Sequence, residues 1–333
     1  MAGTNVLDVE NLTASFDTSA GSFPAIDQIS FNVAKGETVC IVGESGCGKS
    51  ITALSIMGLI PSPPGKITEG AIHLEGEDLI RFSTDRLLSI RGKDISMIFQ
   101  EPMTSLNPVF TIGKQIEEVF LNHTKASKGE ARKLAIEMLK KVGISQPEIR
   151  AKEYPHQLSG GMRQRVMIAI ALACNPKLLI ADEPTTALDV TIQAQILELM
   201  KELKRNSGTS IILITHDLGV VAEMADKVIV MYAGSIVETA DVFSLFKEPA
   251  HPYTEALLKS IPSIEEEVKF LQVTKGSIPL LSEMPEGCKF HPRCQYATDK
   301  CRSSRPPLKK VKNGHESACW YAVELQLKGV LEA

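Results

Sequence analysis

One short segment, the sequence GESGCGKS at residues 43–50, constrains the fold of this chain more than any other feature. It matches G-x-x-x-x-G-K-[ST], a pattern whose glycines allow backbone N–H groups to curl around phosphate oxygens. An apolar run precedes it at residues 38–42, and a stretch typical of a helix follows to about residue 59. The N-terminus of that helix would add partial positive charge. The segment predicts a strand, a phosphate-binding loop and a helix; the alternative is an ordinary glycine-rich turn.

This loop, called the P-loop below, supplies a set of candidate nucleotide contacts. Lys49 is expected to reach the β- and γ-phosphates, and the Ser50 hydroxyl to ligate Mg²⁺. The candidate contacts are Gly43, Glu44, Ser45, Gly46, Cys47, Gly48, Lys49, Ser50 and Ile51.

Apolar patterns elsewhere predict alternating strands and helices. Residues 26–34 alternate between apolar and polar side chains, as in a half-buried strand. Buried strands are predicted from apolar runs at 38–42, 178–180, 211–214 and 228–231. Apolar residues between 131 and 142 recur at helical spacing, and Gly143 is placed to end that helix. The outline is an α/β fold with a largely parallel core.

Two carboxylates follow one of the predicted buried strands. Asp182 and Glu183 come directly after the apolar run that begins at Leu178. Asp182 is expected to hold Mg²⁺, and Glu183 to polarise a water that attacks the phosphate. A solvated acidic turn is the alternative, but together with the P-loop the pair predicts the second half of a nucleotide site.

Composition excludes several classes of protein. The chain has 333 residues, with 36 basic and 40 acidic side chains, and a net charge of −4 argues against a dedicated nucleic-acid binder. Its longest apolar stretch, at 166–174, is nine residues long, whereas a membrane span needs about 20. Residues 166–172 are therefore predicted to form a buried helix. No signal peptide is evident at the N-terminus, so we expect a cytosolic chain with any membrane role exerted through partners.

Further motifs resemble those of ABC ATPases. The sequence LSGGMRQR at 158–165 resembles the signature motif of that family and lies about 20 residues before the strand that carries Asp182. Gln100 matches the Q-loop glutamine, and Asp189 matches the D-loop aspartate. His216 matches the switch histidine, and Phe16 is placed like the aromatic residue that stacks on adenine. This resemblance covers about residues 8–250 and implies an ABC-type P-loop ATPase core.

The resemblance implies that two such domains dimerise head to tail around ATP. The signature residues Ser159, Gly160, Gly161 and Gln164 would then cap the γ-phosphate held by the other domain, with backbone N–H groups as an anion site. Catalysis is expected from Glu183, His216 and Gln100, and Mg²⁺ ligation from Ser50, Gln100 and Asp182. Cys47 departs from the serine common at its position, and we expect a thiol to pack there without loss of activity.

Two stretches narrow the resemblance to the dipeptide/oligopeptide importer subfamily. They are FQEPMTSLNP at 99–108, where Glu101 replaces a more common aspartate, and HPYT at 251–254, which GCKFHPRC at 287–294 continues. The subfamily implies two transmembrane permeases, a paralogous ATP-binding subunit, an extracytoplasmic peptide-binding protein and a peripheral place on the cytoplasmic face of the inner membrane. Alternatives are another cargo, such as nickel, glutathione or oligosaccharides, or a soluble ABC ATPase without permeases.

Four of the seven cysteines gather near the C-terminus: Cys288, Cys294, Cys301 and Cys319. Thiolates in a reducing compartment suggest a soft-metal site, although the spacing matches neither zinc ribbons nor bacterial ferredoxins. Free structural cysteines and disulfides are the alternatives. The subfamily resemblance implies a [4Fe–4S] cluster on these four residues, with Zn²⁺ as the alternative.

Taken together, the motifs predict an ATPase domain at 5–255, with a helical subdomain at about 101–172, and a C-terminal metal-binding domain at 256–333.

Overall fold

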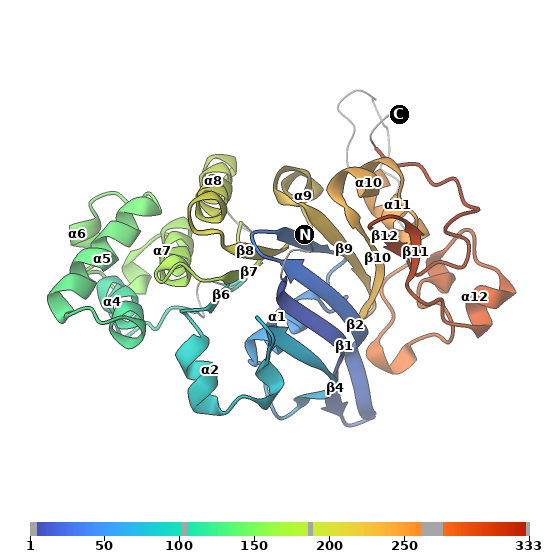
Figure 1. The fold of residues 1–333 in the computed structure, drawn as a ribbon, viewed down its shortest axis with the longest axis horizontal. Helices are drawn as coiled ribbons and strands as arrows, with labels where there is room; N and C mark the ends of the chain where they lie inside the picture. Colours follow the sequence, from blue (N-terminus) through green and yellow to red (C-terminus); the bar gives the residue numbers. More distant parts are fainter. Residues whose placement is uncertain (1–4, 102–104, 186–188, 261–275, 331–333) are drawn as a thin grey trace. The chain divides into compact units, whose positions relative to one another are not determined.

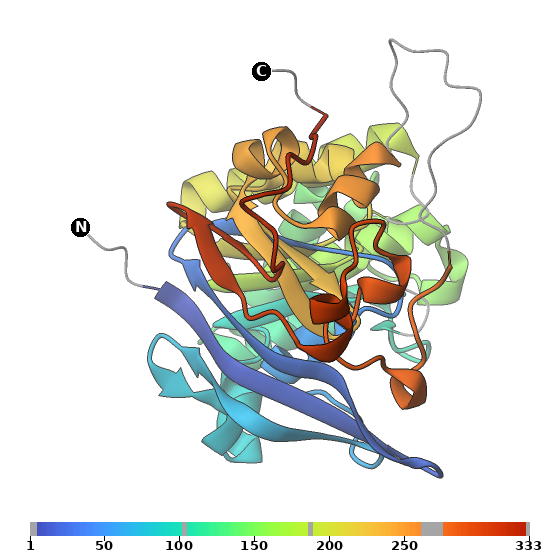
Figure 2. The same cartoon turned by 90° about the vertical axis from the view of Figure 1, so that its right-hand side faces the viewer.

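A computed structural model describes residues 5–101, 105–185, 189–260 and 276–330 (Figures 1 and 2). The chain divides into two compact units. The first unit comprises Met1–Leu7, Val33–Glu37 and His73–Ile214, and the second comprises Asp8–Asn32, Thr38–Ile72 and Thr215–Ala333. Each unit is described by itself below.

The first unit contains three parallel strands and a group of helices. The strands β6 (Ile95–Ile98), β7 (Leu178–Asp182) and β8 (Ser210–Ile214) pair in that order, and every residue in them is buried. Parallel strands covered on both faces have continuous apolar sequences, which is why the apolar runs at 178–180 and 211–214 predicted β7 and β8 correctly. The sequence analysis did not predict β6.

Four of the first unit's helices lie within the range predicted for a helical subdomain, and they cluster in the green part of Figure 1. The helices of this unit are α2 (Thr84–Ile90), α4 (Ile112–His123), α5 (Lys128–Lys141), α6 (Pro147–Arg150), α7 (Gly160–Leu172) and α8 (Val190–Ser207). Helix α5 begins at a capping box formed by Ser127 and Glu130 and ends before Gly143, whose φ is +74°. The predicted helix and its end are thus confirmed.

Helix α7 is buried around its circumference, as the apolar stretch at 166–172 predicted. Its Arg165 is also buried, and the guanidinium donates to the carbonyl oxygens of Val142 and Gly143 at 2.9 and 2.8 Å. The same side chain donates to Gln195 of α8 at 2.7 Å. Because these bonds satisfy a buried cation, they fix α7 against the end of α5 and against α8.

The second unit contains a mixed sheet and part of a second layer formed by the N-terminal strands. In the mixed sheet the order is β11 (Lys309–Lys312), β12 (His315–Ser317), β10 (Ser235–Asp241), β9 (Lys227–Tyr232) and β3 (Thr38–Val42). Strands β3 and β9, each expected from an apolar run, pair in parallel. The strands β2 (Gly21–Ala34), β1 (Asn5–Thr18) and β4 (Gly65–Leu74) form the other layer in that order, with β5 (Glu77–Asp78) beside the end of β4.

Strand β2 shows where simple alternation fails. It extends over the predicted 26–34, but Gln28 has a φ of +52°, which interrupts the alternation, so Ile26 and Ile29 are both buried. Phe31, predicted to face the core, is only half-buried. A local departure of this kind changes which side chains face each side of a strand.

Strand β10 pairs with both β9 and β12, and the helices of the second unit after residue 214 are short (Figure 2). They are α9 (Leu218–Met224), α10 (Val242–Lys247), α11 (Pro252–Lys259) and α12 (Asp299–Ser303), with the P-loop helix α1 (Lys49–Met57) elsewhere in the unit. Short 3₁₀ helices occur at Leu79–Arg81, Pro155–Gln157, Leu281–Glu283 and His291–Arg293. In the described part of the chain, no helix is long and apolar enough to cross a membrane.

Candidate functional site

The P-loop connects β3 to α1 in the second unit, and its backbone conformation requires glycine at three positions. Gly43, Gly46 and Gly48 have φ values of +150°, +82° and +106°. A Cβ atom at Gly43 would collide with the carbonyl oxygen of Met231, and one at Gly48 would lie 2.9 Å from Ile26. Only glycine adopts such backbone without strain and leaves room for these neighbours. The sequence motif therefore specifies the shape of the loop directly.

Lys49 lies inside this loop. Its side chain is buried, and the ammonium donates to the carbonyl oxygens of Gly43 at 2.7 Å and Glu44 at 3.1 Å. Because α1 begins at Lys49, this cation and the free N–H groups of the first helical turn face the same loop. Together they form a concentrated positive site suited to phosphate oxygens.

Cys47 of the loop is a packed, unreactive thiol. It is completely buried, and burial raises the pKa of the thiol above its ordinary value. It therefore stays protonated at neutral pH and packs inside the loop.

Two other predicted residues of the second unit lie near helix and strand ends. Phe16 on β1 is half-buried. Its ring packs so close to Gly65 that a Cβ atom added at Gly65 would lie 2.9 Å from the ring. His216 is exposed directly before α9, whose N-terminus Asp217 caps by accepting from the N–H groups of Gly219 and Val220. The cap fixes the turn on which His216 stands.

In the first unit, the carboxyl end of β7 carries the predicted acidic pair. Asp182 is the last residue of the strand and is 4% exposed. Glu183 has a φ of +47°, and its N–H donates to the Ile214 carbonyl oxygen at 2.9 Å. A positive φ at a residue other than glycine is strained backbone, and such strain is concentrated at functional sites.

Gln100 reaches Glu183 directly. The Gln100 amide nitrogen donates to a carboxylate oxygen of Glu183 at 3.2 Å. The structure thus brings together two residues, 83 positions apart, that sequence analysis assigned to one catalytic group. A carboxylate held by an amide is oriented without being neutralised, as a general base requires.

The signature motif begins a helix in this same unit. Ser159 caps α7 by accepting from the Met162 N–H at 3.3 Å, and the residues at the start of the helix are exposed or half-exposed. The buried Gln164 donates to the Pro184 carbonyl oxygen at 2.6 Å, which ties α7 to the turn after Glu183. Gln164, predicted from the sequence to contact nucleotide, is buried within its own unit.

A cavity of about 310 Å³ lies beside the signature motif, lined in part by Ser159, Gly161 and Asp189. Asp189 caps α8 by accepting from the Ile192 N–H at 2.9 Å. The neighbouring D-loop positions 187 and 188, and the Q-loop positions 102–104, lie outside the described residues.

The predicted metal centre is not supported in the cysteine-rich segment, residues 287–319. Its four cysteines line one small cavity of about 20 Å³, enough for about one water molecule. Among the described residues, no group of three or more His, Cys, Asp or Glu side chains is arranged to hold a metal ion. The prediction of a metal-binding C-terminal domain therefore lacks support from assembled coordination geometry.

The environment of these thiols is nevertheless distinctive. Burial raises the pKa of Cys294 to about 11 and that of Cys319 to about 12. The Tyr321 N–H donates to the Cys319 sulfur at 3.5 Å, and the Thr298 hydroxyl lies 3.6 Å from the Cys301 sulfur. The donor chemistry suits a soft metal or cluster, which would have to displace the thiol protons.

One functional contact had no signal in the sequence. Glu44 of the P-loop forms an ion pair with Arg293, 249 positions away, at 2.9 Å. From the sequence, Glu44 was predicted as a nucleotide contact, because no local pattern indicates a partner so distant.

Comparisons with known proteins agree with this site. Residues 26–186 match the family model described as ABC transporter, and residues 237–301 match that of the oligopeptide/dipeptide transporter C-terminal region. The chain is 59% identical to the oligopeptide transport ATP-binding protein AppD of Bacillus subtilis, over 95% of this chain and 97% of that protein. It is 50% identical to the dipeptide transport ATP-binding protein DppD of Escherichia coli, over 96% and 97%.

A solved structure extends the likeness to three dimensions. The ATP-binding cassette MJ0796, in a dimeric post-hydrolysis state bound to ADP and phosphate, shares 31% identity with a TM-score of 0.65. The similarity covers 71% of this chain and 98% of that one.

Proposed function

Because the chain belongs to the ATP-binding proteins of the oligopeptide/dipeptide ABC transporter family, we propose that it hydrolyses ATP to energise the import of short peptides. The observation that carries this proposal is the near full-length similarity, which includes the C-terminal region as well as the ATPase core. The P-loop with its buried Lys49 supplies the physical basis for nucleotide binding.

Each residue of the proposed nucleotide site is assigned one role in the reaction. Lys49 and the N–H groups of the P-loop bind the β- and γ-phosphates and neutralise their charge. Glu183 accepts a proton from the attacking water, and the Gln100 amide holds its carboxylate. His216, on its capped turn, contacts the γ-phosphate.

Mg²⁺ would be held by Ser50, Gln100 and Asp182, and would supply charge neutralisation on the phosphate oxygens. Oxygen donors such as a hydroxyl, an amide and a carboxylate are those that Mg²⁺ prefers. Asp182 is buried at the end of β7, where a carboxylate is expected to meet a cation rather than bulk water.

A second ATP-binding subunit would complete the site. The start of α7, with Ser159, Gly160 and Gly161, presents N–H groups that have no acceptor within the helix and would cap a γ-phosphate held by the partner. We infer a paralogous partner in a heterodimer, two transmembrane permeases and an extracytoplasmic peptide-binding protein, and a peripheral place on the cytoplasmic face of the inner membrane. The alternative is that the same machinery imports nickel, glutathione or oligosaccharides.

We also propose that Cys288, Cys294, Cys301 and Cys319 hold a [4Fe–4S] cluster, with Zn²⁺ as the alternative. Support comes from their common cavity and from the N–H donor to the Cys319 sulfur. Metal analysis and visible absorbance of anaerobically purified protein test this. Cys301→Ser should lose the metal, whereas the matched Cys174→Ser, outside the cavity, should keep it. A colourless, metal-free wild-type protein would contradict the proposal.

Glu183→Gln tests the assigned general base. We expect ATP binding to persist while turnover falls on the order of 10²–10⁴-fold, because the amide cannot take up the proton. Phosphate release and nucleotide binding are measured together. Glu75→Gln is the control, since the Glu75 side chain pairs with Lys35 and Lys177 in the same unit. Wild-type turnover in Glu183→Gln would remove that residue as the base.

Capture of the complex tests the transport role. A mild-detergent pull-down from native membranes should recover two permeases, a second ATP-binding subunit and a solute-binding protein. Recovery of ribosomal or nucleic-acid proteins without any permease would contradict import and favour a soluble ABC ATPase.

A further inference from the structure

The P-loop is held by the cysteine-rich segment through a two-bond ion pair. The Arg293 guanidinium donates one hydrogen bond to each carboxylate oxygen of Glu44, at 2.9 and 3.0 Å. Glu44 is the second residue of the motif that begins at Gly43. A forked arginine–carboxylate contact fixes both direction and distance, and is stronger than a neutral hydrogen bond.

Arg293 is itself firmly placed. Its side chain is only 7% exposed. The guanidinium carbon lies 5.7 Å from the ring centre of Tyr232 and 6.0 Å from that of Phe290, and these two rings pack edge to face at 5.2 Å. A buried cation between aromatic faces is held by the rings as well as by its carboxylate. The pair therefore has little freedom to rearrange.

The backbone of Glu44 is held as well. Its N–H donates to the Tyr253 hydroxyl at 2.8 Å, and Tyr253 is completely buried at the start of α11. The Glu44 carbonyl oxygen in turn accepts from the ammonium of Lys49 at 3.1 Å. Glu44 thus joins residues of the C-terminal region on one side to the phosphate-binding lysine on the other.

The position of Arg293 depends on the turn between two of the cysteines. The Cys288 N–H donates to the Cys301 carbonyl oxygen at 2.8 Å, and the Arg293 N–H donates to the Phe290 carbonyl oxygen at 3.0 Å. Gly287, with a φ of +70°, approaches the Cys301 backbone so closely that a Cβ would collide with it. The backbone that packs Cys288 against Cys301 therefore also positions the Arg293 side chain.

We propose that Arg293 is a positioning residue for nucleotide binding: through Glu44 it holds the P-loop in the shape that accepts phosphate, and so makes the cysteine-rich segment a determinant of ATP affinity. This rests on the proposed nucleotide site at the P-loop. Arg293 does not touch the nucleotide in this scheme; it acts through the conformation of Glu44 and the placement of Lys49.

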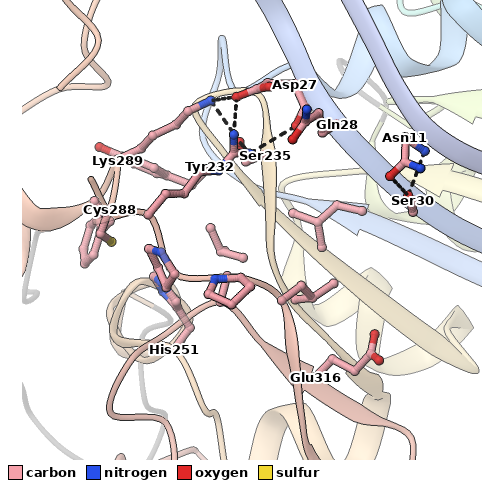
Figure 3. Close-up of a pocket in the computed structure, with 18 residues that line it drawn as sticks. Asn11, Asp27, Gln28, Ser30, Tyr232, Ser235, His251, Cys288, Lys289 and Glu316 are labelled. Atoms are coloured by element: carbon pink, nitrogen blue, oxygen red, sulfur yellow. Dashed lines mark hydrogen bonds and ion pairs between the residues drawn. The ribbon is translucent and has the colours of Figure 1, made fainter. Parts of the chain in front are cut away.

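A second ion-pair group of the same segment provides a matched control. Lys289 and Arg305 both bind the Asp27 carboxylate on β2, at 3.1 and 2.7 Å, and Figure 3 shows Lys289 directed at Asp27 and Ser235. Arg305→Gln removes one of these two cations and leaves Asp27 paired with Lys289. It therefore weakens the attachment of the segment without touching Glu44.

The test is the dissociation constant of a fluorescent ATP analogue on the full-length chain, with the melting temperature as a measure of folding. Arg293→Gln and Glu44→Gln should each weaken binding about tenfold, the scale of a lost charged hydrogen bond. The double variant should bind no more weakly than the weaker single one, because both substitutions break the same contact. Arg293→Lys, which keeps charge but not the fork, should be intermediate, and Arg305→Gln should bind as the wild type does.

Glu44→Gln is the variant that keeps the test informative if Arg293→Gln fails to fold, since the Glu44 side chain is 30% exposed. The positioning role is overturned if Arg293→Gln, Glu44→Gln and Arg305→Gln all lower the melting temperature while the affinity for ATP stays unchanged. The contact between Arg293 and Glu44 would then be purely structural. Additive effects in the double variant would also overturn the positioning role. Lys49→Ala separates the two hypotheses: if it binds the analogue normally, the nucleotide site itself is wrong, whereas weak binding by Lys49→Ala with normal binding by Arg293→Gln refutes only the positioning role.

Discussion

The P-loop and the cysteine-rich segment are both irregular backbone in the second unit, but different information determines their shapes. Eight consecutive residues specify the P-loop, because Gly43 and Gly48 occupy conformations and spaces that only glycine tolerates. The cysteine-rich segment is assembled from residues spread over positions 287–319, which meet through backbone bonds such as Cys288 to Cys301. A site formed by consecutive residues can be predicted from the sequence, whereas a site formed by residues far apart in the chain is recognised only in the folded structure.

The largest effect is expected for Lys49→Ala in the P-loop. The substitution removes the buried cation of the P-loop, and we expect the affinity for ATP to fall about 100-fold, or about 2.7 kcal/mol. Nucleotide titration of the purified chain measures this effect. Lys35→Ala is the control, because Lys35 forms an exposed ion pair with Glu75. Equal binding by Lys49→Ala and Lys35→Ala would show that the P-loop does not hold the nucleotide.

Two glycine substitutions separate steric from conformational constraint within the P-loop. Gly43→Ala should destabilise the folded chain by about 1–3 kcal/mol, because the methyl group meets the Met231 backbone and a φ of +150° is strained. Gly46→Ala also has a positive φ, but nothing lies within 4 Å of its Cβ position, so the loss should be smaller. Urea unfolding compares the two. A larger loss in Gly46→Ala would contradict the steric account.

The thiols of the cysteine-rich segment predict a pH-dependent stability in metal-free protein. Burial raises the pKa of Cys294 to about 11 and of Cys319 to about 12, from an ordinary value of 9.0. The folded state therefore favours the protonated thiols, and their contribution to stability is full below pH 9 and is lost as the pH rises to about 12. Thermal unfolding across this range, with Cys319→Ser as the comparison, checks the sign. Equal pH dependence in both proteins would contradict it.

The structure confirms those parts of the sequence analysis that rest on local physics. The strands β3, β7, β8 and β9 follow from apolar runs, and the end of α5 follows from Gly143. The meeting of Gln100 with Glu183 was expected only from the family resemblance, because no spacing rule joins residues 83 positions apart.

Features stabilised by distant partners were missed. Strand β12 has three residues and no alternating pattern, yet it pairs with β10, where the buried carboxylate of Glu238 meets His315 at 2.7 Å. The same carboxylate accepts from the N–H groups of Ala250 and His251. These bonds stabilise a strand that local propensity would not form, and the Arg293–Glu44 contact escaped prediction for the same reason.

ATP-dependent uptake of a labelled dipeptide into proteoliposomes that contain the purified transporter complex tests the central claim most directly. With ATP on the side of this subunit and peptide-binding protein on the other, we predict uptake by the wild-type complex and its loss in the complex that carries Glu183→Gln. Peptide uptake that persists at the wild-type rate with Glu183→Gln, or ATP hydrolysis that never drives peptide accumulation, would contradict the account.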